Sequence, residues 1–76
     1  MALTFDQLRE DIADVLGEDV EDIPLDENLV DYGLDSVRLM ALAGRWRDAH
    51  GVRVEVADLA ENPAVEEWAA LLGLRA

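Results

Sequence analysis

A carboxylate and a hydroxyl stand side by side at the end of one short stretch, Asp31 Tyr32 Gly33 Leu34 Asp35 Ser36 Val37. Gly33 can adopt backbone angles that are closed to other residues, and Asp and Ser are both favoured helix caps. We therefore predict a turn that leads into a helix N-terminus. Unpaired N–H groups and the positive end of the helix dipole favour a phosphate at such a place. Ser36 is a candidate to carry a phosphodiester.

Length and composition limit the possible classes of function. Seventy-six residues make a single domain, 1–76, that buries only about 60% of its unfolded surface and has no room for a deep active-site cleft. Without Cys, the chain has no disulfide and no Cys metal cluster, and one His offers few catalytic partners. We predict a non-catalytic protein without a metal site. Nothing at Met1 resembles a signal peptide, and no apolar run is long enough to span a membrane, so we expect a cytoplasmic protein. We also expect a monomer.

Charge is unevenly distributed along the chain, whose net charge is −12. Residues 1–36 carry twelve acids against Arg9 alone, whereas residues 37–54 carry four arginines against Asp48 alone. A helix-turn-helix nucleic-acid binder would explain a basic middle helix, but the surrounding negative charge opposes the approach of phosphates. We expect basic protein partners, with neither nucleic acid nor membrane.

Apolar residues at helical spacing predict four helices around one core. The first is capped by Thr4, with Gln7 reaching back to complete a capping box, and ends at Gly17. The last is expected to use Asn62 as its cap and Pro63 as its first helical residue. The expected core faces of these two helices are Phe5, Leu8, Ile12, Val15 and Leu16, and Val65, Trp68, Leu71 and Leu72.

Two connections join these helices to the middle of the chain. Residues 18–35 form a long acidic connection that its apolar residues should pin to the core, with a helical turn near Leu29 and Val30. Its acids do not follow EF-hand spacing, so a solvated acidic face is expected rather than a calcium loop. In residues 52–61 we predict a short connection followed by a third helix at 56–60. Alternation of Val52, Val54 and Val56 suggests a strand, but that strand would have no partner.

The second helix is predicted from Ser36 to His50, ending at Gly51. One side carries the expected core residues Leu39, Leu42 and Trp46, with Ala43, Ala49 and His50 at the edges. The other side places an apolar strip beside Ser36, and we predict a docking surface there. Packing of Met40 under a neighbouring loop is the alternative. The strip and its surroundings comprise Val37, Met40, Ala41, Gly44 and Arg47, with Val56 as a contribution from the third helix.

Arginines on the second helix divide into two groups. Arg45 and Arg47 lie in its last turns, where they would complement the helix dipole. Arg38 lies in the first turn, where the dipole does not favour a cation, so we assign it to the docking surface as well.

The run from Asp31 to Arg47, DYGLDSVRLMALAGRWR, resembles the signature of carrier proteins, specifically the aryl carrier domains of siderophore-type nonribosomal peptide synthesis. The likeness extends from about Thr4 to Leu72. It implies an all-α fold: a small four-helix carrier-protein bundle with a long loop between helices 1 and 2 and a short helix 3. Further positions resemble the aryl carrier domain fused to isochorismatase, namely His50 Gly51, Leu59 Ala60, Asn62 Pro63 and Trp68.

The resemblance implies a function that fits the absence of cysteine. Ser36 would receive 4′-phosphopantetheine from coenzyme A through a phosphopantetheinyl transferase, which would recognise Asp35. An aryl-adenylating enzyme would load the thiol of the arm, and the thioester would be presented to a condensation domain of a nonribosomal peptide synthetase. Asp35 serving simply as the helix cap is compatible with this role.

Departures from related families favour an aryl carrier. Fatty-acid carriers typically continue with an acidic second helix, whereas here Val37 and Arg38 follow the serine. Peptidyl carriers usually show Gly-Gly-His or Gly-Gly-Asp before the serine. An acyl or peptidyl carrier for another substrate is the nearest alternative. An unmodified helical docking module is the alternative of another class, and it would tolerate Ser36→Ala.

Overall fold

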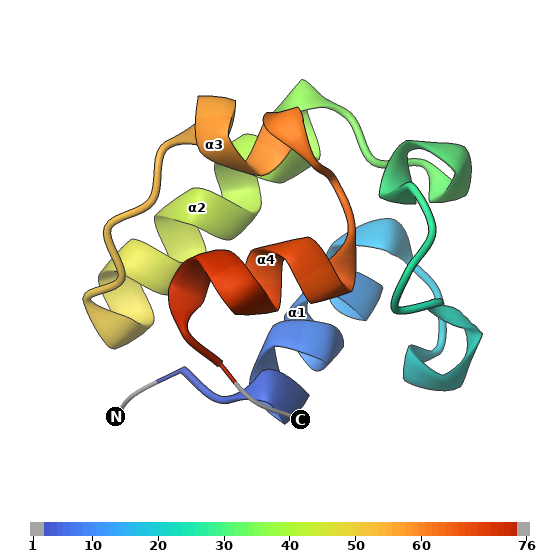
Figure 1. Cartoon of the computed structure of the whole chain (residues 1–76), viewed down its shortest axis with the longest axis horizontal. Helices are drawn as coiled ribbons and strands as arrows, with labels where there is room; N and C mark the ends of the chain where they lie inside the picture. The colour runs from blue at the N-terminus through green and yellow to red at the C-terminus, as the bar shows by residue number, and fades with distance from the viewer. Residues whose placement is uncertain (1–2, 75–76) are drawn as a thin grey trace.

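The computed structural model describes residues 3–74 (Figure 1). The elements follow in the order α1 (Phe5–Leu16), η1 (Val20–Asp22), η2 (Leu29–Tyr32), α2 (Ser36–His50), α3 (Val56–Glu61) and α4 (Val65–Leu72), where η1 and η2 are single 3₁₀ turns. No strand occurs in this part of the chain. The expected all-α bundle, with a long loop between the first two α-helices and a short third one, is confirmed.

Two tryptophans form the centre of the core. Trp46 of α2 and Trp68 of α4 are 0% and 1% exposed, and their rings meet edge to face with centroids 6.1 Å apart. Such a pair contributes about 0.5–1.5 kcal/mol beyond the area that it buries. Each indole N–H is satisfied: Trp46 Nε1 donates to Asp11 Oδ2 and Trp68 Nε1 to the Leu59 carbonyl, both at 2.9 Å. The remaining fully buried side chains are Leu8, Ile12, Leu29, Leu42, Leu59 and Val65.

At the N-terminus of α1, the predicted Thr4 cap is confirmed but the predicted role of the Gln7 side chain is wrong. Thr4 Oγ1 accepts a hydrogen bond from the Gln7 N–H at 3.1 Å, and Gly17 ends the helix with φ of 69°. The Gln7 side chain does not reach back, which corrects the capping box. Gln7 Nε2 instead donates to Asp11 Oδ1 at 2.9 Å, because this carboxylate one turn further on offers a charged acceptor.

The long connection between α1 and α2 is held against the core and against α4. Its side chains Ile23, Leu29 and Leu34 are buried. Its backbone bonds to Pro63, which precedes α4, and to the first turn of α4. The Leu29 N–H donates to the Pro63 carbonyl at 2.7 Å, and the Leu25 carbonyl accepts from the Glu66 N–H at 2.9 Å. The predicted helical turn is η2, and its buried residue is Leu29.

The last helix begins later than its sequence suggests. Asn62 and Pro63 were expected to start it, but α4 begins at Val65 with Ala64 as its cap. Asn62 ends α3 instead, and its carbonyl accepts from the Ala64 N–H at 2.8 Å in a tight turn. The Pro63 carbonyl is turned to the connection between α1 and α2. Val52 and Val54 pack, partly buried, against the core without forming a strand.

Arg45 joins α2 to α1 rather than complementing the end of its own helix. Its guanidinium contacts Asp14 Oδ2 at 2.9 Å and the buried Asp11 Oδ1 at 3.3 Å. Asp11 therefore accepts hydrogen bonds from Gln7, Arg45 and Trp46, which compensates for burying a carboxylate. Within residues 3–74, no helix is both long and apolar enough to cross a membrane.

Candidate functional site

The turn before α2 positions Asp35 and Ser36. Gly33 ends η2 with φ of 99°, a left-handed conformation that favours glycine. The chain then extends through Asp35, whose Oδ1 accepts from the Arg38 N–H at 2.9 Å, so Asp35 is the predicted cap. Ser36 becomes the first residue of α2. Asp35 and Ser36 are both exposed at the surface.

The surroundings of Ser36 fit a phosphate ester. Its side chain is exposed, and it lies in the first helical turn, where N–H groups lack intrahelical partners. A phosphate on this oxygen would lie in solvent at the positive end of the α2 dipole. Among the described residues, no group of His, Asp and Glu is arranged to hold a metal ion.

Arg38 is held by three oxygens from two parts of the chain. Its Nε donates to the Val15 carbonyl at 2.9 Å, and its Nη1 donates to the Gly33 carbonyl at 3.2 Å and to Asp35 Oδ2 at 2.8 Å. This explains a cation in a first helical turn, because the carboxylate and the C-terminal end of α1 offset the unfavourable dipole. Sequence reasoning missed these contacts, since Val15 lies 23 residues away.

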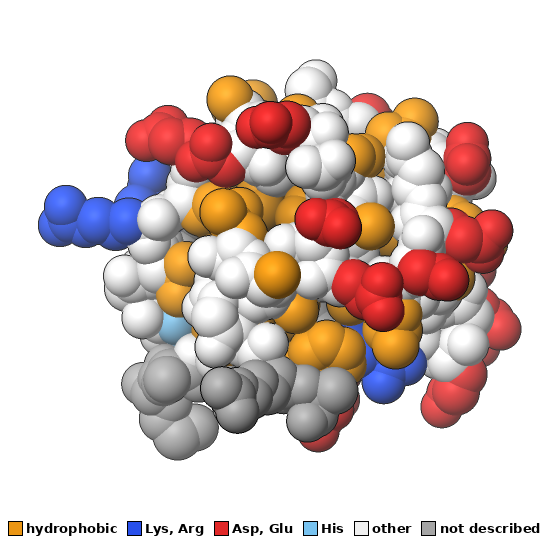
Figure 2. Space-filling view, viewed as in Figure 1, with side chains coloured by type: hydrophobic (Ala, Val, Ile, Leu, Met, Phe, Trp, Pro, Cys, Tyr) orange, Lys and Arg blue, Asp and Glu red, His pale blue; other side chains and the backbone are white. Residues whose placement is uncertain are grey.

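The approach to the site is acidic. Figure 2 shows acidic side chains gathered on the right of the molecule, where the connection between α1 and α2 runs in Figure 1. At the end of this connection, the Tyr32 hydroxyl donates to Glu27 Oε2 at 3.1 Å. This hydrogen bond, helped by the nearby acids, raises the pKa of Tyr32 above its ordinary value.

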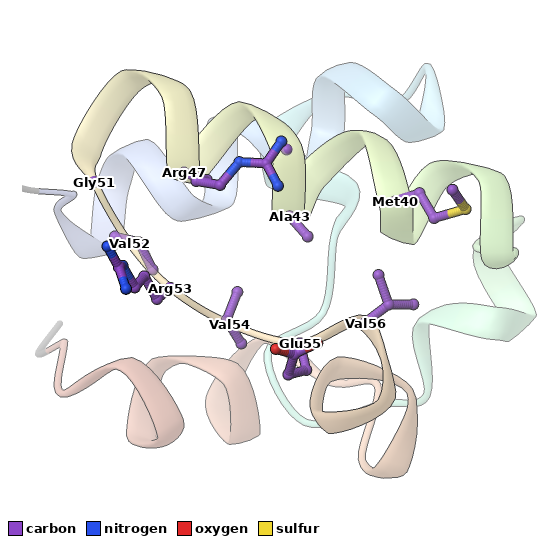
Figure 3. A pocket seen from close by; sticks show the side chains of 10 residues that line it. Met40, Ala43, Arg47, Gly51, Val52, Arg53, Val54, Glu55 and Val56 are labelled. Carbon is purple, nitrogen blue, oxygen red and sulfur yellow. The ribbon is translucent and has the colours of Figure 1, made fainter.

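A groove runs along α2, starting one turn, or about 6 Å, beyond Ser36. It has a volume of about 700 Å³ and separates α2 from the segment 51–56 (Figure 3). We call it the α2 groove. Its lining consists of Met40, Ala43, Gly44 and Arg47 of α2, and Gly51, Val52, Arg53, Val54, Glu55 and Val56.

The α2 groove brings together four of the predicted docking residues, Met40, Gly44, Arg47 and Val56. Met40 is 63% exposed, so its packing as core filler is excluded. Val37 and Ala41 are exposed on α2 outside this lining. The sequence did not lead us to expect Val52 to Glu55 in this lining. Their alternation of apolar and charged residues was the available signal, because Val52 and Val54 pack against the core and leave the charged residues that follow them exposed.

The guanidinium of Arg38 faces α1 and is not part of the lining. Helix α2 thus contributes Arg47 to the α2 groove, whereas its Arg38 is turned towards the bundle.

Comparison with known protein families identifies the family of this chain. A family model described as "Phosphopantetheine attachment site" matches residues 6–72. The chain belongs to this family. Its members carry covalently attached 4′-phosphopantetheine, and the chain is a carrier domain.

Individual relatives point in the same direction. The chain is 52% identical over 65 residues to enterobactin synthase component B of Escherichia coli K12, covering 86% of this chain and 22% of that protein. It is 47% identical over 72 residues to an isochorismatase of Bacillus subtilis, covering 95% and 23%. It is 48% identical over 67 residues to phenyloxazoline synthase MbtB of Mycolicibacterium paratuberculosis, covering 88% and 6%.

The carrier domain spans less than a quarter of the length of these relatives. The resemblance to the aryl carrier domain that accompanies isochorismatase is confirmed. Carrier domains of this family interact with phosphopantetheinyl transferases and with enzymes of the synthetase.

Proposed function

We propose that Ser36 is the residue that carries 4′-phosphopantetheine. The single observation behind this assignment is an exposed hydroxyl at the first position of α2, beside the capping carboxylate of Asp35, within the segment that matches the family. The α2 N-terminus supplies N–H groups and a positive dipole end that suit the resulting phosphodiester.

The modification requires little chemistry from the carrier itself. Ser36 Oγ would attack the β-phosphorus of coenzyme A; a new P–O bond forms while the pyrophosphate bond breaks, and adenosine 3′,5′-bisphosphate leaves. The serine proton passes to a base of the transferase. Asp35 would present its carboxylate to the basic or metal-bearing surface of that enzyme, since it would repel the phosphodiester of the product. When attached, the arm supplies the thiol that holds the acyl group as a thioester.

We further propose that the acyl group is an aryl acid, loaded by an aryl-adenylating enzyme and delivered to a condensation domain. Similarity to an isochorismatase and to enterobactin synthase component B supports this class of substrate and partner. An acyl or peptidyl carrier for another substrate is the alternative.

The α2 groove and its surroundings are the proposed docking surface for these partners. Met40, Gly44, Arg47 and Val56 would contact them from inside the groove. Val37 and Ala41 would contribute from the exposed surface of α2 outside it. A partner that places an apolar side chain between α2 and the segment 51–56 would bury Met40, which is now largely exposed.

Mass spectrometry of peptides from the modified carrier tests the assignment. After incubation with coenzyme A and a broad-specificity transferase, the arm should be found on the peptide that contains Ser36. The modified carrier should then gain an aryl group from a salicylate- or dihydroxybenzoate-adenylating enzyme with ATP. Loading by an amino-acid-adenylating enzyme alone would support the alternative carrier instead.

A further inference from the structure

Arg38 controls the geometry of Asp35 more tightly than a helix cap requires. Both oxygens of the Asp35 carboxylate are used: Oδ1 accepts from the Arg38 backbone N–H at 2.9 Å, and Oδ2 accepts from Arg38 Nη1 at 2.8 Å. One residue therefore holds the carboxylate from two directions. A side chain held in this way loses most of its rotational freedom before any partner arrives.

The same guanidinium also connects the turn to the body of the protein. It bonds to the Gly33 carbonyl on one side and to the Val15 carbonyl in the last turn of α1 on the other. The last turn of α1 has no basic residue of its own. The positive charge of Arg38 therefore interacts favourably with the negative end of the α1 dipole, and its Nε donates to the Val15 carbonyl, which is in that last turn. Arg38 thus links three elements: the end of α1, the Gly33 turn and the cap of α2.

We propose that Arg38 is a positioning residue for the phosphopantetheinyl transfer and acts through Asp35. This inference rests on the proposed function. By fixing the carboxylate beside Ser36 in a single orientation, Arg38 preorganises the surface that the transferase recognises, so less freedom is lost on binding. Arg38 does not touch the reacting hydroxyl. Its side chain is 44% exposed, within reach of solvent but already committed to the bundle.

A kinetic comparison of the unmodified carrier and its Arg38→Ala variant tests this role. With coenzyme A and a broad-specificity transferase, we expect KM for the carrier to rise about fivefold while kcat changes little, on the scale of losing partly exposed charge-assisted hydrogen bonds. Arg38→Lys should restore part of the loss, because its ammonium can still reach Asp35 but cannot bond to three oxygens in the fixed geometry of a guanidinium.

Arg9→Ala is the matched control. Arg9 also donates from its guanidinium to a backbone carbonyl, that of Val20 at 3.3 Å, but touches nothing near Ser36. Its removal tests the general effect of a lost arginine tether and should leave KM unchanged. Circular dichroism and urea unfolding should accompany every variant, and the lysine variant carries the test if the alanine variant does not fold.

A double-mutant cycle with Asp35→Asn separates a positioning role from an independent contact. If Arg38 acts through the carboxylate, Arg38→Ala should raise KM clearly less in the Asp35→Asn background than in the wild type. Equal increases in the two backgrounds, or an unchanged KM in the single variant, would overturn the inference. A wild-type carrier that is never modified would instead overturn the proposed function.

Discussion

At the scale of single residues, the position of Ser36 at the start of α2 was easier to predict than the contacts around it. Asp35 and Ser36 are neighbours in a recognisable turn, so local capping rules were enough to place them at the start of α2. Arg38 and Arg45 instead bond to oxygens of α1, 23 or more residues away. Helical periodicity describes one helix at a time and cannot say which arginine faces another helix.

Asp11 gives the sharpest stability prediction at this scale. It is 6% exposed and accepts from Gln7, Arg45 and the buried indole of Trp46. Asp11→Ala should lower the free energy of unfolding by about 2–3 kcal/mol, because the Trp46 N–H loses its acceptor inside the core. Urea unfolding followed by tryptophan fluorescence measures this.

Asp14→Ala is the control for Asp11, since Asp14 pairs with the same arginine but its side chain is 68% exposed. Its removal should cost less than about 1 kcal/mol. Equal losses for the two variants would show that the buried network contributes no more than a surface ion pair.

At the scale of elements, α1, α2 and α3 were predicted to within a residue or so, because clear caps or apolar spacing mark them. The start of α4 was not. Asn and Pro form a favourable helix start in isolation, but here the Pro63 carbonyl accepts from Leu29, and the backbone turns once more before Val65. A tertiary hydrogen bond thus overrides a local capping preference.

The turn before α2 depends on the backbone of Gly33. A Cβ added there would meet nothing within 4 Å, so the cost of Gly33→Ala comes from its φ of 99° alone. We expect the free energy of unfolding to fall by about 1–2 kcal/mol. Gly44→Ala, in the helical backbone of α2, should raise it by up to about 1 kcal/mol. Urea midpoints of the two variants should shift in opposite directions; shifts of the same sign would contradict this account of the turn.

The α2 groove predicts that modification and delivery depend on different parts of one helix. Met40→Asp should fold and accept phosphopantetheine normally, but slow transfer to the condensation partner about tenfold, which corresponds to about 1.4 kcal/mol of lost contact energy. Single-turnover transfer from the loaded carrier measures this rate.

Leu71→Asp is the matched control for Met40, because Leu71 was expected in the core face of α4 but is instead 51% exposed and lies outside the α2 groove. It should leave the transfer rate unchanged. If both variants transfer at the wild-type rate, the α2 groove is not the docking surface.

At the scale of the whole molecule, the folded carrier offers fewer free cations than its sequence suggests. Residues 37–54 contain four arginines, but Arg38 and Arg45 are bonded to acids and carbonyls of the bundle. Arg47 and Arg53 line the α2 groove, and Arg47 also pairs with the exposed Asp48 at 3.5 Å. With a net charge of −12, the molecule should attract basic surfaces over most of its area.

Intact mass shows whether Ser36 carries the phosphopantetheine arm. The intact masses of the purified chain and its Ser36→Ala variant would be measured by mass spectrometry before and after incubation with coenzyme A and a broad-specificity transferase. The wild type should gain the mass of one phosphopantetheine, while the variant folds with the same circular dichroism spectrum and gains nothing. No gain on folded, unmodified wild type across several transferases, or an equal gain on Ser36→Ala, would contradict the account.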